Sequence, residues 1–488
     1  MKQQTSTAEL LEQVNKVLSE KPLFYLSNDP ERALGLEKFL KNYHIVHIDN
    51  NLYLPFFTES KIKFFCLENA IKKSNTVFRS SLRLLKHPEF LKYFEKHKGK
   101  ENFLQTFKIS PAFSSYAEKL GCKVLNTSAA LNRMFEDKIS QSNELAQLNI
   151  SLPEYLIVNL SGTSFADLVK VLGTKLVVQF TRGHTGSGTE FINNEQDYQK
   201  LQNNFPNRPV RISKLITGDA YTINACVGKN AIYVGGLSYQ LTGIPQLTSG
   251  QGSTVGNDFQ YPENLEKDLK EKIISDIVKI GEHMRNKGYL GLFGVDLIVT
   301  EDVFKIVEIN ARQPASIPMF TKMQLLLKQV PLSLIHLAEF LNLSYNIPQE
   351  SYNTAALVPQ QFSQIFLRAQ SDVSVTGEVS MGSYRLLGDG YTDNLINNDD
   401  SKKSQKVKSP GVIYLDEDRD LPLVFTKRVY AIDQVENGIL LLPAAKGRLV
   451  KINQELARLQ LCEGVLRQNK QLKPWVLKIL IALKNYLL

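Results

Sequence analysis

Four polar residues near the middle of the chain combine the side-chain types that hold a divalent metal ion and a phosphate group. Asp296, Glu308, Asn310 and Arg312 all fall within residues 294–312. Two carboxylates and an amide oxygen are hard ligands that suit Mg²⁺, whose octahedral shell is usually completed by water and substrate phosphates. The planar guanidinium of Arg312 can bind a phosphoryl oxygen or a carboxylate. These residues therefore predict a metal and phosphate site.

A β-hairpin would bring these residues together. Two apolar, β-branched segments, 295–299 and 304–309, flank a short polar turn, which is a pattern typical of a hairpin. In such a hairpin Asp296 and Glu308 would be neighbours across the ladder. Because side chains alternate between faces along a strand, Glu308 and the polar residues two and four positions later would point the same way. Taken alone, the motif leaves open a plain hairpin with a salt-bridged polar face.

A second segment, residues 175–192, is a candidate phosphate cradle. Its pattern predicts a strand, a glycine-bearing loop and another strand. Gly183, Gly186 and Gly188 would let backbone amides approach an anion more closely than other residues permit. A hairpin turn rich in Gly, Ser and Thr is the alternative. Residues 210–227 predict two further strands around a Thr-Gly turn.

These segments lie in a chain of 488 residues, a length that predicts about three domains. Near the start, strands over 22–27 and 45–48 flank an amphipathic pattern over 31–43, which predicts a helix and a small parallel α/β domain. Helical patterns follow over 61–108. A long helix is predicted from about residue 265 to 286, directly before the metal hairpin.

The last part of the chain carries no catalytic motif. Short strands are predicted over 365–368, 411–414 and 438–442. The polar, lysine-rich stretch 397–409 predicts a mobile loop.

Composition places the chain among soluble globular proteins. Hydrophobic residues make up 43% and charged residues 22%, with a net charge of +9, which is a mild bias rather than a nucleic-acid signature. Much of the positive charge lies in residues 59–108, where a solvated helical face is favoured over an anionic partner. The four cysteines are far apart and form no Cys-x-x-Cys pair, so a reducing, cytoplasmic location is expected.

No segment of the sequence predicts a membrane span. The start of the chain lacks the apolar core of a secretory signal. The nearest approach to a span is residues 475–488, which are too short and contain Lys478 and Lys484. A helix docked on the protein or on a partner is expected there, with attachment to a membrane surface as the minor alternative.

The order of these blocks over roughly residues 1–345 resembles the ATP-grasp superfamily, whose relatives include biotin carboxylase, carbamoyl phosphate synthase and D-alanine:D-alanine ligase. The resemblance rests on Glu-x-Asn-x-Arg at 308–312, with an Asp twelve residues upstream of the Glu, and on the glycine loop before it. It implies a mixed α/β and α+β fold. A small parallel α/β domain would occupy residues 1–125, a two-lobed ATP-grasp domain 126–345, and a β-rich α+β domain of unassigned role 346–488.

The resemblance also implies that ATP lies between the two lobes, together with Mg²⁺ or, as an alternative, Mn²⁺. The implied metal ligands are Asp296, Glu308 and Asn310, and the implied catalytic residue is Arg312. The residues implied to bind the nucleotide are Lys138, Gln179, Arg182, Gly183, Gly186, Ser187, Gly188, Lys214, Leu215, Ile216 and Asp219. Among these, Lys138 corresponds to the lysine that reaches the α-phosphate, and residues 214–216 to the hinge that meets adenine.

Three positions depart from the family pattern. Gln179 stands where the family usually has a lysine before the glycine loop, and a charge-assisted hydrogen bond is worth about 1.5–3 kcal/mol against about 1 for a neutral one. Arg182 is the nearby candidate for a replacement cation. Ser213 replaces an acidic hinge residue, and Ala220 replaces a glutamate that grips the ribose, a role that Asp219 could take over.

The activity implied is that of a ligase, which phosphorylates a carboxylate with ATP and then joins the acyl phosphate to an amine or similar nucleophile. Small-molecule carboxylate and amine substrates are expected, nucleic acid is not, and a homodimer is left open. Two alternatives share the ATP site: a small-molecule kinase, and a nucleotide-binding sensor or scaffold without turnover.

Overall fold

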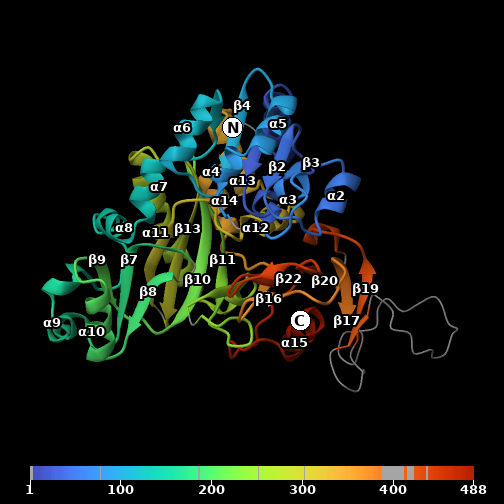
Figure 1. Ribbon diagram of the computed structural model, residues 1–488. Coiled ribbons are helices and arrows are strands. Elements are labelled where there is room, and N and C mark those ends of the chain that lie inside the picture. The colour runs from blue at the N-terminus through green and yellow to red at the C-terminus, as the bar shows by residue number, and fades with distance from the viewer. Residues whose placement is uncertain are drawn as a thin grey trace. The chain divides into compact units, whose positions relative to one another are not determined.

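The computed structural model describes the chain apart from residues 1–3, 77, 185–186, 251, 302, 387–411, 415–421 and 436–437. The chain divides into two compact units, shown as ribbons in Figure 1. The first comprises residues 1–49, 61–240 and 261–360, and the second comprises residues 50–60, 241–260 and 361–488. The finer division into three domains stays a prediction.

A parallel sheet of five strands opens the first unit, in the order β3-β2-β1-β4-β5. The strands are β1 (Leu23–Leu26), β2 (Tyr43–His47), β3 (Lys63–Cys66), β4 (Asn102–Thr106) and β5 (Cys122–Val124). The helices around them are α1 (Thr7–Leu18), α3 (Leu67–Ala70), α4 (Ser81–Leu85), α5 (Pro88–His97) and α6 (Pro111–Lys119). Apolar side chains of the strands pack against Phe90 and Phe94 of α5. The predicted parallel α/β arrangement is confirmed.

The helix predicted over 31–43 is wrong. Only the short turn η1 (Pro30–Ala33) is helical between β1 and β2. Gly35 has a φ of 125°, a conformation outside the helical region. The buried Glu37 carboxylate accepts a hydrogen bond from the Gly35 amide at 2.6 Å and another from the Lys322 ammonium at 2.8 Å. A long-range ion pair thus overrides the amphipathic pattern.

The helical reading of residues 61–108 is right for three short helices and wrong at both ends. Strands β3 and β4 occupy those ends and belong to the parallel sheet. Phe65 of β3 and Leu104 of β4 are buried in the core of that sheet. Burial on the sheet therefore decided the conformation of these short apolar runs, which local periodicity does not distinguish from buried helix.

A separate antiparallel sheet of four strands follows, in the order β6-β9-β7-β8. The strands are β6 (Tyr155–Asn159), β7 (Leu176–His184), β8 (Ser187–Ile192) and β9 (Pro209–Lys214). Leu168 of α9 (Phe165–Leu172) and Tyr198 of α10 (Glu195–Asn204) share a core with apolar residues of the strands. Among the core residues are Val178 and Ile212. Because side chains alternate along a strand, Gln179 and Arg211 lie on the other face.

A second antiparallel set of strands in this unit has the order β14-β13-β10-β11. These are β10 (Asp219–Val227), β11 (Ile232–Thr242), β13 (Gly291–Thr300) and β14 (Val303–Asn310). The associated helices are α7 (Ala129–Glu136), α8 (Lys138–Leu145), α11 (Lys267–Asn286), α12 (Ile317–Leu326), α13 (Leu332–Phe340) and α14 (Gln349–Ala355), with the turns η2 (Leu160–Gly162) and η3 (Tyr261–Asn264). The predicted long helix before the hairpin is confirmed as α11.

The second unit is rich in β-structure. Its strands run in the order β12-β15-β22-β20-β17-β19-β18. They are β12 (Thr254–Asp258), β15 (Ser363–Arg368), β17 (Gly382–Leu386), β18 (Val412–Tyr414), β19 (Pro422–Lys427), β20 (Ile439–Pro443) and β22 (Glu455–Leu461), while β16 (Val373–Ser374) pairs with β21 (Leu449–Val450). The remaining elements are α2 (Leu54–Glu59), η4 (Ile432–Gln434) and α15 (Pro474–Leu487). The strands predicted near 365, 412 and 439 are confirmed, and the stretch 397–409 lies outside the described residues.

The helix predicted at the end of the chain is α15. It buries Val476, Ile479 and Leu483 and leaves Ile481 46% exposed, so it docks on the protein as expected. Within the described part of the chain, no helix is long and apolar enough to cross a membrane.

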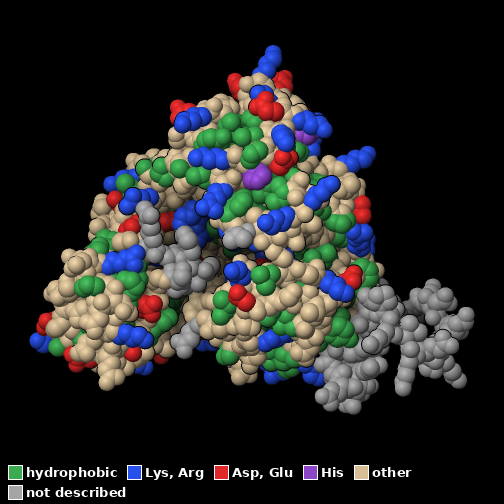
Figure 2. Space-filling model, viewed as in Figure 1, with side chains coloured by type: hydrophobic (Ala, Val, Ile, Leu, Met, Phe, Trp, Pro, Cys, Tyr) green, Lys and Arg blue, Asp and Glu red, His purple; other side chains and the backbone are tan. Residues whose placement is uncertain are grey.

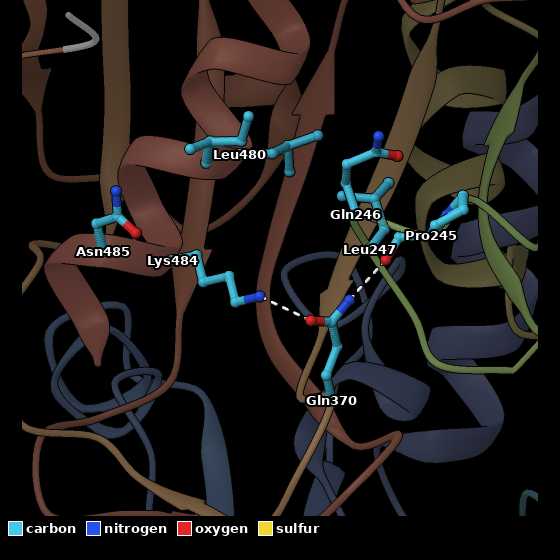
Figure 3. A pocket seen from close by; sticks show the side chains of 8 residues that line it. Pro245, Gln246, Leu247, Gln370, Leu480, Lys484 and Asn485 are labelled. Carbon is cyan, nitrogen blue, oxygen red and sulfur yellow. Dashed lines mark hydrogen bonds between the residues drawn. The ribbon is translucent and has the colours of Figure 1, made fainter.

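A groove in the second unit, with a volume of about 360 Å³, lies beside α15. Lys484 donates to Gln370 Oε1 at 2.8 Å, and Gln370 Nε2 donates to the Pro245 carbonyl at 2.6 Å; dashed lines mark both bonds in Figure 3. These polar groups of the groove therefore satisfy one another.

The positive charge of the N-terminal region is solvated and partly paired. In α5, Lys92 lies 2.8 Å from Glu89, and Lys98, just beyond the helix, lies 2.7 Å from Glu95. Figure 2 shows basic side chains interspersed with acidic ones over the visible face. The arrangement agrees with the expected solvated helical face.

Candidate functional site

The predicted hairpin is present, formed by β14 and β13, the second of which is labelled in Figure 1. Asp296 is paired with Glu308 across the ladder, and Gly294 with Asn310. The ladder register shifts just after Asp296, which marks a β-bulge beside the two carboxylates. Bulges are common next to active sites, where they redirect side chains. The expectation that Asp296 and Glu308 are direct neighbours is confirmed.

Amide groups hold the Asp296 carboxylate in place. Asn310 Nδ2 donates to Asp296 Oδ2 at 3.0 Å, and Gln240 Nε2 of β11 donates to Asp296 Oδ1 at 2.9 Å. Burial and, next, the like charge of Glu308 raise the pKa of Asp296 from 3.8 to about 6. A cation between the two carboxylates would relieve both effects, because it stabilises the charged forms.

Lys138 joins this cluster from the first turn of α8. The side chain of Asp137 caps that helix by accepting hydrogen bonds from the amides of Ile139 and Ser140, both at 3.1 Å. The Lys138 side chain is 8% exposed, and its ammonium forms an ion pair with the Glu308 carboxylate. Lys138 is therefore buried and paired with Glu308 rather than an exposed helix lysine, while its role toward a nucleotide stays a prediction.

Arg312 is held on several sides just beyond β14. Its Nε lies 2.8 Å from Glu136 Oε1, and its Nη2 donates to Asn310 Oδ1 at 2.8 Å. The guanidinium carbon lies 4.8 Å from the centre of the Phe107 ring, which is within the range of a cation–π contact. Glu136 and Phe107 were not recognised in the sequence, because their roles depend on contacts with distant segments.

The predicted phosphate cradle is the β7–β8 hairpin of the four-stranded sheet. His184 pairs with Ser187, and Gly188 has a φ of 107°, a conformation that favours glycine. Gly183 lies within β7. Gly186 lies outside the described residues, as do the side chains of Arg182 and Ser187.

Gln179 faces an arginine across the same sheet. Gln179 of β7 is paired with Arg211 of β9, whose Nη1 donates to Gln179 Oε1 at 2.6 Å. Arg211 was not among the predicted site residues. The signal available in the sequence was its position one residue before Ile212, in a strand where buried apolar residues alternate with the opposite face.

The predicted hinge is the connection between β9 and β10. Lys214 is exposed at the end of β9, and the Leu215 amide donates to the Lys175 carbonyl at 2.9 Å. Ile216, which follows Leu215, is partly buried. Beyond the hinge, Asp219 at the start of β10 shares a hydrogen bond with the Tyr239 side chain.

The hairpin offers three side chains with oxygen ligands for a divalent cation: two carboxylates and one amide. Among the residues that the structure describes, no three His, Cys, Asp or Glu side chains converge in a manner that could hold a metal ion alone. Asp296, Glu308 and Asn310 nevertheless fit Mg²⁺, which is commonly held by one or two carboxylates with water and phosphate completing the shell. The raised pKa of Asp296 marks the unbalanced negative charge that such an ion would neutralise.

Comparison with known proteins bears on this geometry. Residues 135–316 match the family model described as an ATP-grasp domain. This part of the chain is an ATP-grasp domain. The matched range begins in α7, contains Lys138 and the four-stranded sheet, and extends past Arg312. It therefore includes every residue of the site named above except Phe107.

Solved structures share the fold of the chain beyond the ATP-grasp domain. A biotin carboxylase from Campylobacter jejuni in complex with β-γ-ATP is 14% identical with a TM-score of 0.56, covering 77% of this chain and 84% of that chain. N5-carboxyaminoimidazole ribonucleotide synthetase from Thermotoga maritima is 13% identical with a TM-score of 0.52, covering 96% and 98%. The biotin carboxylase domain dimer of Hydrogenobacter thermophilus 2-oxoglutarate carboxylase, solved with MgADP and bicarbonate, is 12% identical with a TM-score of 0.54, covering 91% and 86%. At these identities the likeness establishes the fold.

Proposed function

We propose that the chain is an ATP- and Mg²⁺-dependent ligase that activates a carboxylate as an acyl phosphate and joins it to an amine or a similar nucleophile. The observation that carries the proposal is the Asp296–Glu308 pair on the β13–β14 ladder, with Lys138 bound to one carboxylate and Arg312 fixed beside Asn310. The match to an ATP-grasp domain and the nucleotide-bound relatives support it.

In this proposal Asp296, Glu308 and Asn310 hold Mg²⁺, which neutralises charge on the phosphates of ATP when bound. Lys138 supplies a second positive charge from α8, already positioned by its ion pair with Glu308. Arg312 stabilises negative charge on the transferring phosphoryl group. Since Arg312 is fixed beforehand by Glu136 and Asn310, little reorganisation is needed at that moment.

The β7–β8 hairpin would cover the phosphates in this arrangement. Backbone amides of the hairpin would bind phosphate oxygens, and the hairpin would exclude water from the bound nucleotide. Exclusion of water is needed in a ligase of this kind, because an acyl phosphate is otherwise lost to hydrolysis. The substrates in this proposal are a small-molecule carboxylate and an amine; a cytoplasmic location is part of the proposal, and a homodimer is left open.

Two other functions would use the same nucleotide site. A small-molecule kinase would transfer the phosphoryl group to a hydroxyl and stop there. A sensor or scaffold would bind nucleotide without turnover, which the neutral Gln179, Ser213 and Ala220 favour. The acceptor requirement separates the three: ADP release that needs both a carboxylate and an amine identifies the ligase, release with a hydroxyl compound alone identifies the kinase, and binding without release identifies the sensor.

The first test is ATP binding by calorimetry, with and without Mg²⁺, on the native chain and on Glu308→Ala. Glu301→Gln is the matched control, because Glu301 is an exposed acid in the turn of the same hairpin. We expect Mg²⁺-dependent binding that Glu308→Ala loses and Glu301→Gln keeps. The same samples are then screened for ADP release over pairs of carboxylates and amines. Absence of ATP binding by the native chain would refute the site.

A further inference from the structure

A buried arginine without a carboxylate partner among the described residues lies on the face of the four-stranded sheet that is opposite its apolar core. The Arg211 side chain is in the middle of β9, and the whole residue is 5% exposed. Its Nη1 donates to Gln179, but its Nε has no hydrogen-bond partner among the residues that the structure describes. Arg211 also forms no ion pair with any residue that the structure describes.

Burial of the unpaired Arg211 guanidinium destabilises the folded protein unless an anion binds to it. Arginine remains protonated in proteins, and a buried charge that is neither paired nor fully hydrogen-bonded opposes folding. The Tyr155 ring, 5.0 Å from the guanidinium carbon, offsets only part of this cost. Burial is the main influence on the pKa of Arg211 and lowers it, while the Glu308 carboxylate acts in the opposite direction. Arg211 therefore lies within electrostatic reach of the metal hairpin.

Arg211 also lies beside the position where the family resemblance leads us to expect a phosphate-binding lysine. Gln179 is neutral and is directly opposite Arg211 in the ladder. Residues opposite each other in an antiparallel pair have Cβ atoms about 4.5–5.5 Å apart, so a long side chain on either strand reaches the same space. The cation expected on β7 is thus present one strand away, on β9.

We propose that Arg211 is a phosphate-binding residue of this site, with Gln179 orienting its guanidinium through the hydrogen bond to Nη1. The proposal rests on the proposed nucleotide site and names the group that compensates for its neutral Gln179. Nε and the second terminal nitrogen remain to bind phosphate oxygens in the two-pronged manner typical of arginine. Arg211 replaces Arg182 as our candidate for the missing cation.

The test compares ADP with adenosine, which lacks phosphates, by calorimetry with Mg²⁺ on the full chain. We expect Arg211→Leu to weaken ADP binding at least about tenfold, the effect of losing a charge-assisted hydrogen bond, and to leave adenosine binding unchanged. Arg208→Leu is the matched control, because Arg208 is an exposed arginine that stacks on Phe180 and Phe205 near the same strand. Arg208→Leu should bind both compounds like the native chain.

A second variant places the positive charge on β7 instead of β9. Gln179→Lys combined with Arg211→Leu puts a cation on β7 and removes the one on β9, and we expect it to recover most of the ADP affinity. Thermal unfolding checks that each variant is folded. Arg211→Leu should unfold at the same or a higher temperature without nucleotide, because it removes a buried charge.

The outcomes separate this proposal from the one on which it rests. If the native chain binds neither ADP nor adenosine, both proposals are refuted. If the native chain binds ADP and Arg211→Leu binds it equally well, only the role of Arg211 is refuted. Equal losses of ADP and adenosine binding would show that Arg211 shapes the site without contacting phosphate, and would also overturn the proposal.

Discussion

Neutralising Asp296 and neutralising Glu308 should change the stability of the protein in opposite directions, although the two carboxylates face each other on one ladder. Burial and Glu308 raise the pKa of Asp296 from 3.8 to about 6. A tenfold change in the acid dissociation constant is about 1.4 kcal/mol, so the charged form of Asp296 costs the folded state about 3 kcal/mol. Asp296→Asn removes this cost and loses one hydrogen bond, worth about 1 kcal/mol.

We therefore expect Asp296→Asn to raise the free energy of unfolding by about 2 kcal/mol at pH 7.5 without metal. The folded protein binds the Asp296 proton more tightly than the unfolded chain, so native stability falls as pH rises from about 4 to 6. The advantage of the variant should accordingly shrink to less than about 1 kcal/mol at pH 5.

Glu308→Gln should be destabilising in the same buffer. It leaves the Lys138 ammonium, whose side chain is 8% exposed, without its carboxylate. Removing one partner of a buried ion pair costs about 3–5 kcal/mol. Because the Glu308 side chain is 31% exposed, we expect a smaller loss of about 1–3 kcal/mol.

The assay is thermal unfolding of the native chain and both variants in EDTA, at pH 5 and pH 7.5. A change of 1 kcal/mol should move the midpoint by about 2–4 °C for a domain of this size. Addition of Mg²⁺ with ADP should stabilise the native chain and neither variant. The reasoning is refuted if Asp296→Asn lowers the midpoint at pH 7.5, or if its effect is the same at both pH values.

Three further predictions concern single residues. Lys138→Met should reduce ATP affinity by about tenfold or more, because it removes a charge-assisted contact; calorimetry measures this, and unchanged affinity would exclude Lys138 from the site. Glu37→Gln should cost about 3–5 kcal/mol by leaving Lys322 buried without its anion, and adding Lys322→Met should restore most of the loss in urea unfolding. Gly218→Ala should lower the unfolding temperature, because a Cβ there would lie 2.4 Å from the Val299 carbonyl oxygen; an unchanged midpoint would show that the backbone yields easily.

Local patterns in the sequence were sufficient to predict several elements of this fold. The two apolar, β-branched runs that flank the short polar turn predicted the pairing of β13 with β14, and with it the juxtaposition of Asp296 and Glu308. Side chains on a strand alternate by covalent geometry. The register of two strands joined by a short turn can therefore be predicted without knowledge of the rest of the protein. The helix α11 could also be predicted locally, because its apolar residues recur with helical periodicity over a long stretch.

The amphipathic stretch at 31–43 shows where such patterns are not enough. Its periodicity is helical, but the buried contact between Glu37 and Lys322 joins residues 285 positions apart. Local propensity is a weak influence, typically below about 1 kcal/mol per residue, and a buried ion pair with its hydrogen bonds outweighs it. The domain boundaries and the nucleotide-binding roles stay predictions.

The sequence by itself determined which residue types the site contains and which of them share a strand: two acids, an amide and an arginine on one hairpin. Only the tertiary structure decided that Lys138 meets Glu308, that Gln240 holds Asp296, and that Arg211 lies opposite Gln179. The physical reason is that these contacts join separate elements. Their partners are selected by how helices and sheets pack, and packing depends on the whole core rather than on any local run of residues.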